Sequence, residues 1–154
     1  MDIRRVFDPN DAGVAALVEK SDQYLSALYP PESNHAEPLD ALVSNEAALF
    51  AGYIEGRIAA CGGVRVHKHD VRYGEIKRVF VDEQHRGKRL AVAMMDHLER
   101  YLVENDITVA RLEAGPKQPE ALKLYRRLGY QMRGPFGSYA PDPLSVFMEK
   151  RLIG

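Results

Sequence analysis

Basic side chains cluster where an apolar run gives way to a helical pattern. The segment VFVDEQHRGKRLAVAMMDHLERYL, residues 79–102, begins as an extended apolar run and ends with the spacing of an amphipathic helix. Arg86, Gly87, Lys88 and Arg89 stand between the two parts. Each cation at an electropositive helix start costs about 0.3–1 kcal/mol unless an anion binds there. Because a helix start also offers free N–H groups and glycine allows close approach, this junction predicts a phosphate site.

The alternative for this cluster is a solvated basic turn without a ligand, which is the usual explanation of a charge run alone. The order of strand, glycine and helix favours phosphate instead. The chain has no G-x-x-x-x-G-K-[S/T] segment and no G-x-G-x-x-G segment. A P-loop nucleotide site and a dinucleotide site are therefore not predicted.

Cysteine and histidine offer two further chemistries. Cys61 could form a covalent intermediate, but its setting, RIAACGGV, is apolar and favours a buried core thiol. His67 and His69 alternate in VHKHD and could face the same way as metal ligands. Since no third ligand is near them, we expect no metal site, and the apolar setting of Cys61 argues against a covalent intermediate.

Length and composition are those of a globular protein. The chain has 154 residues, 45% apolar and 28% charged, which suits a single domain over residues 1–154. A net charge of −1 gives no field that would attract nucleic acid or a membrane surface. The chain has a single cysteine, a polar N-terminal segment and no run of about 20 apolar residues. These features predict a cytoplasmic location.

The elements that must position these residues alternate along the chain. Helical spacing predicts helices near 8–28, 38–44, 88–104 and 119–128, the last capped by Gly129. The proline-containing segment 29–38 must be a loop. Strands are expected at 2–7, successively and antiparallel across 47–82 with a turn at Glu55-Gly56, and in 107–114, 130–134 and 144–152. This order predicts a mixed α/β layer structure with helices on both faces of the sheet.

Two segments resemble motifs of the GNAT superfamily of N-acetyltransferases. VFVDEQHRGKRLAVAMM is similar to its acetyl-CoA motif [R/Q]-x-x-G-x-[G/A], with Arg86 and Ala91 at the first and last positions. PEALKLYRRLGY resembles A-x-x-L-Y-x-x-x-G-[F/Y], and the matching residues are Ala121, Leu124, Tyr125, Gly129 and Tyr130. With the strand GEIKRVFV and the order of elements, the resemblance covers nearly the whole chain.

The resemblance implies a fold and a cofactor site. The fold is a single-domain, mostly antiparallel mixed sheet flanked by helices and splayed at its centre, where acetyl-CoA lies in a V-shaped gap. Backbone groups of Val79, Phe80 and Val81 would pair with the pantetheine arm, and Gln118 and Tyr125 would also bind the cofactor. The pyrophosphate would be held by N–H groups of Arg86, Gly87, Lys88, Arg89, Leu90 and Ala91. The family also implies a monomer or a homodimer.

Two positions depart from the family pattern. Arg89 stands where the motif has its middle glycine. If that position needs a positive φ, arginine there is strained by roughly 1 kcal/mol or more. We expect instead that Arg89 lies in the first helical turn, with its side chain toward a CoA phosphate. Gln118 replaces an asparagine that many members carry and offers the same amide chemistry with longer reach.

The resemblance assigns Tyr125 to protonating the departing thiolate, a role that suits a phenol with a pKa near 10. The alternative is a tyrosine that only packs between helix and sheet. For the base that deprotonates the amine we nominate Glu75, acting directly or through water, against the alternative of a surface carboxylate. One strand face is expected to carry Tyr73, Glu75, Lys77, Val79 and Val81.

The acceptor is expected opposite the cofactor. The loop LYPPESNHAEP could form a wall in which Ser33, Asn34 and His35 contact a small polar molecule or only cap the next helix. The turn-rich segment PFGSYAPDPLSVFMEK could add Tyr139. These features predict an acetyl-CoA-dependent N-acetyltransferase that acts on a primary amine of a small molecule by direct attack. The alternative is a non-catalytic acyl-CoA-binding or sensor domain of the same fold.

Overall fold

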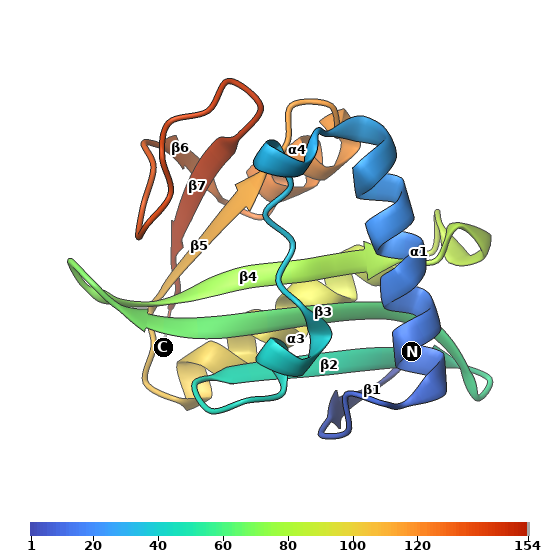
Figure 1. Ribbon diagram of the computed structural model, residues 1–154. Coiled ribbons are helices and arrows are strands. Elements are labelled where there is room, and N and C mark those ends of the chain that lie inside the picture. The colour runs from blue at the N-terminus through green and yellow to red at the C-terminus, as the bar shows by residue number, and fades with distance from the viewer. Residues whose placement is uncertain (154) are drawn as a thin grey trace.

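The computed structural model describes residues 1–153 and contains one seven-stranded sheet in the order β1-β2-β3-β4-β5-β7-β6 (Figure 1). The strands are β1 (Asp2–Val6), β2 (Ala47–Ile54), β3 (Arg57–Lys68), β4 (Arg72–Val81), β5 (Val109–Ala114), β6 (Gln131–Arg133) and β7 (Val146–Arg151). The helices are α1 (Ala12–Leu28), α2 (Leu39–Leu42), α3 (Leu90–Glu104) and α4 (Pro119–Arg127), with 3-10 turns η1 (Pro31–Ser33) and η2 (Glu83–His85).

Strands β1 to β4 pair antiparallel in chain order, and the sequence predicted this arrangement for β2 to β4. The β2–β3 hairpin turns at Glu55 and Gly56, which both have positive φ, 52° and 78°. Two successive left-handed residues match the right-handed twist of a tight hairpin, which explains the glycine at the second position. Among the described helices, none is long and apolar enough to cross a membrane.

The sheet is split at its centre, between β4 and β5. These two strands are parallel and pair through three residues each, Gly74–Ile76 with Ala110–Leu112. Beyond that point they separate, so that β5 leads away from β4 toward α4 (Figure 1). The mixed sheet with a splayed centre confirms the predicted fold class.

A β-bulge lies where β4 leaves β5. The β3–β4 register shifts between Cys61 and Gly63, and Arg78 on the opposite strand has a φ of 58°. A bulge bends its strand and increases the local twist, which opens the gap toward β5. Three contacts hold Arg78 in this conformation. Its carbonyl accepts a 3.2 Å hydrogen bond from the Cys61 thiol, and its guanidinium donates to Glu37 O and Asp22 Oδ1.

The bulge also reverses the alternation of side chains along β4. Tyr73 lies in a small cluster with Phe136 on one face, whereas Val79 and Val81 pack into the core under α3 on the other. Phe80 packs on the α1 side. The expectation that Tyr73, Glu75, Lys77, Val79 and Val81 share one face is therefore wrong, because the extra residue at the bulge shifts the period of two.

Two hydrophobic layers enclose the sheet. One lies between the sheet and helices α3 and α4, and the other lies between α1, α2 and the first three strands (Figure 1). Gly62 and Gly74 let α3 approach closely, because a Cβ at either position would overlap the side chain of Met94 or Leu102. These layers fix the positions of β4, α3 and α4, from which the cleft is built.

Candidate active site

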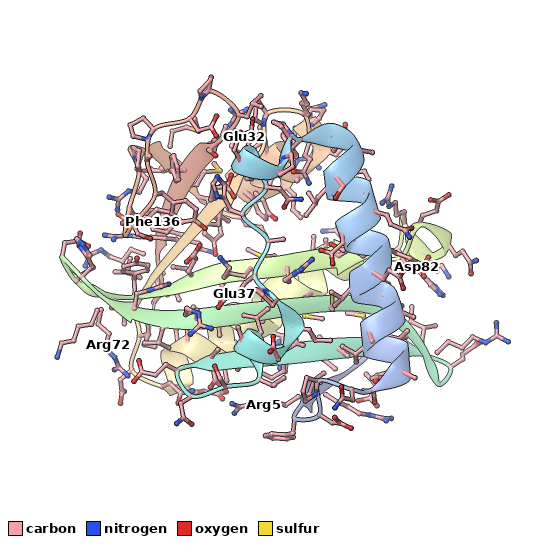
Figure 2. The ribbon with its side chains drawn as sticks, viewed as in Figure 1. Arg5, Glu32, Glu37, Arg72, Asp82 and Phe136 are labelled. Atoms are coloured by element: carbon pink, nitrogen blue, oxygen red, sulfur yellow. The ribbon has the colours of Figure 1, made fainter. Side chains whose placement is uncertain are left out.

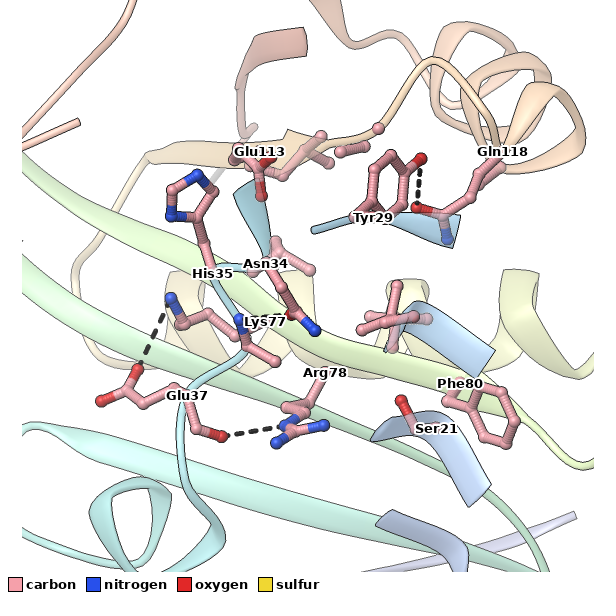
Figure 3. Close-up of a pocket in the computed structure, with 18 of the residues that line it drawn as sticks. Ser21, Tyr29, Asn34, His35, Glu37, Lys77, Arg78, Phe80, Glu113 and Gln118 are labelled. Carbon is pink, nitrogen blue, oxygen red and sulfur yellow. Dashed lines mark hydrogen bonds and ion pairs between the residues drawn. The ribbon is translucent and has the colours of Figure 1, made fainter. Parts of the chain in front are cut away.

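A pocket occupies the gap between β4 and β5 (Figure 3). Residues 75–80 of β4 and 112–114 of β5 line it, together with α1, the segment 33–37 and the start of α4. Nine of the predicted site residues meet in its wall: Ser33, Asn34, His35, Glu75, Val79, Phe80, Gln118, Tyr125 and Tyr139. Val81 ends β4 beside the pocket, and residues 86–91 lie beyond it at the start of α3.

The edge of β4 that faces the cleft is open. From Lys77 to Val81, β4 pairs with β3 on one side and has no partner strand on the other among the described residues. Free N–H and C=O groups of a strand edge can bind an extended ligand in the manner of an added strand. Val79, Phe80 and Val81 thus fit the pantetheine arm that the resemblance predicts for them.

The start of α3 is uncapped and basic. Arg89 precedes the helix and no side chain caps it, so the N–H groups of Leu90, Ala91 and Val92 have no acceptor within the helix. Arg86, Gly87, Lys88 and Arg89 are all exposed around these donors. Free N–H groups beside three cations match the requirements of a diphosphate.

The conformation of Arg89 differs from the expected one. Its φ of 59° and ψ of 29° are left-handed, and the helix begins one residue later, at Leu90. The prediction that Arg89 lies in the first helical turn is therefore wrong. Arg89 adopts a left-handed backbone conformation that suits the glycine of the motif, and for arginine this conformation costs about 1–2 kcal/mol.

Gln118 is held by Tyr29, a residue that no sequence pattern had marked. The Tyr29 hydroxyl donates to Gln118 Oε1 at 3.2 Å and accepts from the Lys117 N–H at 3.2 Å (Figure 3). The Tyr29 ring reaches this position because Gly115 leaves room where a Cβ would collide with it. Tyr29 thereby links the end of α1 to the turn before α4.

Glu75 is buried, with 4% of its surface exposed, which excludes the surface carboxylate considered as the alternative. Its two oxygens contact His67 Nε2 at 2.9 Å, the Tyr139 hydroxyl at 2.7 Å and Lys77 Nζ at 3.3 Å. Burial raises its pKa, but the hydrogen bond with His67, the charge of Lys77 and the hydrogen bond from Tyr139 together bring the pKa below its usual value. Glu75 is thus held as a carboxylate with its lone pairs engaged, which makes it a weak base.

Glu113 faces the same pocket from β5 in different surroundings (Figure 3). It is partly buried and has no ion-pair partner among residues 1–153. Burial raises its pKa above the usual value, and the nearby Ser145 hydroxyl, His35 and Lys77 offset only part of this effect. A carboxylate with a raised pKa is better matched to accepting a proton near neutral pH. Glu113 was not predicted from the sequence, where its only signal is a carboxylate near the end of an apolar strand.

Tyr125 lies on α4 with its ring in the pocket wall and 9% of its surface exposed. Burial and the charge of Glu113 raise the pKa of its hydroxyl to about 12. The ring packs edge-on against Tyr130, with centroids 6.0 Å apart. Tyr125 is thus a neutral phenol that keeps its proton at physiological pH and can donate it within the cleft.

Two loops form the wall opposite α4. The Ser33 hydroxyl donates to Asp142 Oδ2 at 2.7 Å and joins the segment after α1 to the β6–β7 loop. Asn34 Oδ1 accepts from the Ala36 N–H at 3.3 Å, and the His35 ring packs edge-on against Tyr139 at 5.2 Å. Figure 2 shows Glu37, from the same segment, in front of the sheet, and this residue forms an ion pair with Lys77 of β4 at 3.7 Å.

The remaining reactive side chains are engaged elsewhere. Cys61 is fully buried, and burial raises its thiol pKa to about 12, so it is a core residue rather than a nucleophile. His67 contacts Glu75 and stacks on Tyr73, with ring centroids 5.1 Å apart.

Comparison with known proteins agrees with this geometry. Residues 14–130 match the model of the Acetyltransferase (GNAT) family. The chain is 37% identical over 144 residues to the IAA acetyltransferase of Azospirillum brasilense, with 94% of each protein covered. A crystal structure from Klebsiella pneumoniae subsp. pneumoniae MGH 78578, provisionally assigned as an acyl-CoA N-acyltransferase, is 34% identical. Its TM-score is 0.80, with 99% of this chain and 97% of that one covered.

A more distant structure shares the fold alone. An aminoglycoside 6'-N-acetyltransferase in complex with coenzyme A has a TM-score of 0.76 at 14% identity, over 100% of this chain and 98% of that one. The family match covers the open strand edge of β4, the basic start of α3 and all of α4. The chain therefore belongs to the GNAT family of acetyltransferases and is an acyltransferase that uses acetyl-CoA.

Proposed function

We propose that the protein transfers the acetyl group of acetyl-CoA directly to a primary amine of a small molecule. One observation carries this proposal: a single cleft joins an open strand edge with the carboxylates of Glu75 and Glu113 and a neutral phenol. The strand edge would bind acetyl-CoA, and the carboxylates and the phenol would carry out the two proton transfers that amide formation requires. The residue roles follow from this division.

The donor site extends from β4 to the start of α3. Val79, Phe80 and Val81 would pair with the pantetheine amides, and the N–H groups and cations of residues 86–91 would hold the diphosphate. Gln118, held by Tyr29, would contact the cofactor from the start of α4. This arrangement directs the thioester toward the pocket that Tyr125 and Glu113 line.

The reaction then needs three groups of this chain. The amine nitrogen attacks the thioester carbonyl carbon, and a β4 backbone N–H at or near Val81 stabilises the negative oxygen. The C–N bond forms, the C–S bond breaks, and Tyr125 supplies a proton to the departing thiolate. The proton lost by the amine passes to a carboxylate of the cleft.

Glu113 is the better candidate for that carboxylate, although Glu75 was nominated from the sequence. Glu75 is engaged by three donors and its pKa lies below the usual value. Burial shifts the pKa of Glu113 in the opposite direction, and no cation is paired with it. We assign Glu113 as the general base and Glu75 as the residue that positions Tyr139 and Lys77 in the acceptor wall.

Mass-spectrometric acetylation of an amine library tests this proposal. We expect an N-acetylated product from at least one small amine. Tyr125→Phe should lower kcat by roughly 100-fold, the lower end for general acid catalysis, with the acetyl-CoA dissociation constant unchanged. Tyr53→Phe on β2 makes the same chemical change outside the cleft and serves as the control.

Two outcomes would contradict the assignments. Saturable acetyl-CoA binding without product from any amine would favour the non-catalytic acyl-CoA-binding domain. Unchanged turnover in Tyr125→Phe would remove Tyr125 from its role as the acid while leaving the enzyme itself in place.

A further inference from the structure

The charged residues that line the cleft are paired, with one exception. Lys77 contacts both Glu75, at 3.3 Å, and Glu37, at 3.7 Å. Arg78 pairs with Asp22 at 2.5 Å. Glu37 also pairs with Arg65 of β3. Among residues 1–153, Glu113 is the lining carboxylate or cation with no ion-pair partner.

The cleft therefore carries an excess of one negative charge. With histidines counted as neutral, the lining residues and their ion-pair partners comprise four carboxylates (Asp22, Glu37, Glu75, Glu113) and three cations (Arg65, Lys77, Arg78). His35, whose charge interaction lowers the pKa of Glu113, lines the same pocket and packs edge-on against Tyr139. A partly buried carboxylate without a cation is costly, and a cationic ligand removes that cost.

We infer that the acceptor binds as a cation with its ammonium group against Glu113, and that amines carrying a carboxylate beside the amine are poor substrates. This inference rests on the proposed N-acetyltransferase function and names its substrate class. A second carboxylate would meet Glu75 and Glu113, while Lys77 and Arg78 are already neutralised by their own partners. Such repulsion is how a site discriminates against a close analogue.

The remaining wall suits an apolar or aromatic body for the acceptor. The rings of His35 and Tyr139 and the side chain of Leu144 line the same pocket as Glu113. Tyr139 is held in place by its hydrogen bond to Glu75 and by contacts with Phe136 and Phe147. The chemical class is thus a small arylalkyl or alkyl monoamine without an acidic group, bound as its ammonium form.

Amines and their parent amino acids provide a direct test. We compare tyramine with tyrosine, tryptamine with tryptophan, and histamine with histidine, because each pair differs by one carboxylate. The expected kcat/KM for acetylation is at least tenfold higher for the amine of a pair. Equal efficiency, or a preference for the amino acid, would overturn the inference.

A binding measurement separates this inference from the proposed function. Protein saturated with CoA, which has no acetyl group to transfer, is titrated calorimetrically with the same compounds. We expect the amine of a pair to bind at least tenfold more tightly than its amino acid. Glu113→Gln should weaken amine binding at least tenfold, whereas Glu32→Gln, an exposed carboxylate on η1 outside the pocket lining (Figure 2), should leave it unchanged.

The acetylation assay and the binding measurement test different claims. Selective amine binding without any acetylation would refute the proposed transfer and leave the cation site standing. Amine binding that is insensitive to Glu113→Gln, or absent for all three amines, would refute the cation site even if other amines are acetylated.

Discussion

At the scale of single residues, Glu75 and Glu113 face one cleft from neighbouring strands and have opposite pKa shifts. The difference comes from their partners, because His67, Lys77 and Tyr139 stabilise the charged form of Glu75. Glu113 lacks a paired cation, so burial dominates and favours its neutral form. Pairs of carboxylates with divergent pKa values often carry distinct roles in catalysis.

This contrast predicts opposite effects on stability. Glu75→Gln should lower the free energy of unfolding at neutral pH by about 1–3 kcal/mol, because it removes hydrogen bonds to a buried charged group. Glu113→Gln should leave the free energy of unfolding unchanged or raise it, because it removes a carboxylate that burial disfavours. Urea unfolding of both variants and the wild type at pH 5 and pH 8 measures these differences.

The pH dependence of these effects also has a defined sign. The pKa of Glu75 is lowered in the folded protein. Its contribution to the free energy of unfolding is therefore fully present above the ordinary glutamate pKa and is lost as the pH falls through the folded pKa. The folded pKa of Glu113 is raised, so stability falls as pH rises from the ordinary value through the folded one. Glu113→Gln should thus gain stability relative to wild type between pH 5 and pH 8. Equal destabilisation by both variants would contradict the assigned environments.

Some residues of the site could be predicted, either from a motif or from a segment placed to line the cleft, as with His35 and Tyr139. Tyr125 and Gln118 follow from their motif segment and line the pocket as expected. Glu113 and Tyr29 have no such mark. Tyr29 matters because Gly115 leaves space for its ring, and Glu113 matters because its surroundings contain no paired cation. Both conditions depend on residues far apart in the chain.

At the scale of elements, the helices and strands follow their sequence patterns, but the bulge in β4 does not. Arginine rarely adopts a positive φ, so nothing at position 78 indicates one. The conformation is imposed by Asp22 of α1, by the Glu37 carbonyl and by Cys61 of β3. Predicting the face on which Val79 and Val81 lie therefore required contacts from three other parts of the chain.

The start of α3 gives an element-scale prediction. Arg89→Gly should raise the free energy of unfolding by up to about 1 kcal/mol, because glycine adopts the left-handed conformation without strain. Acetyl-CoA affinity should fall by less than tenfold, since the N–H donors of the helix start remain. Urea unfolding and calorimetric titration with acetyl-CoA measure the two effects.

Arg86→Gly is the matched control for this change. Arg86 has a φ of −65°, so the same substitution relieves no backbone strain there and should not stabilise the protein. A loss of acetyl-CoA affinity greater than tenfold in Arg89→Gly would mean that the guanidinium contributes more than the backbone.

At the scale of the whole molecule, the sheet consists of two parts, β1 to β4 and β5-β7-β6, joined by three residue pairs. The class of fold and the order of its elements could be predicted, because hydrophobic periodicity and two motifs cover most of the chain. The shape of the acceptor wall could not be predicted, because contacts such as Ser33 with Asp142 set the positions of its loops.

A ligand lying along the β4 edge should stiffen the junction between these two parts. At a hundredfold excess over its dissociation constant, acetyl-CoA should stabilise the fold by about 2.7 kcal/mol. Hydrogen exchange should slow at the cleft-facing amides of Val79–Val81 and at Leu90–Val92. Pantetheine, which lacks the diphosphate, is the matched probe and should protect the β4 amides alone. Protection confined to the start of α3 with acetyl-CoA would contradict pairing along β4.

The hydrogen bond between Ser33 and Asp142 joins two loops that are 109 residues apart in the chain and lie outside the sheet. Loops of this kind tolerate substitutions and length changes that strands do not. The proposed donor site, by contrast, is built on β4 and the start of α3. Evolution can therefore remodel the acceptor wall while conserving the donor machinery, and duplicated copies of such a gene could diverge in substrate range without first losing acetyl transfer.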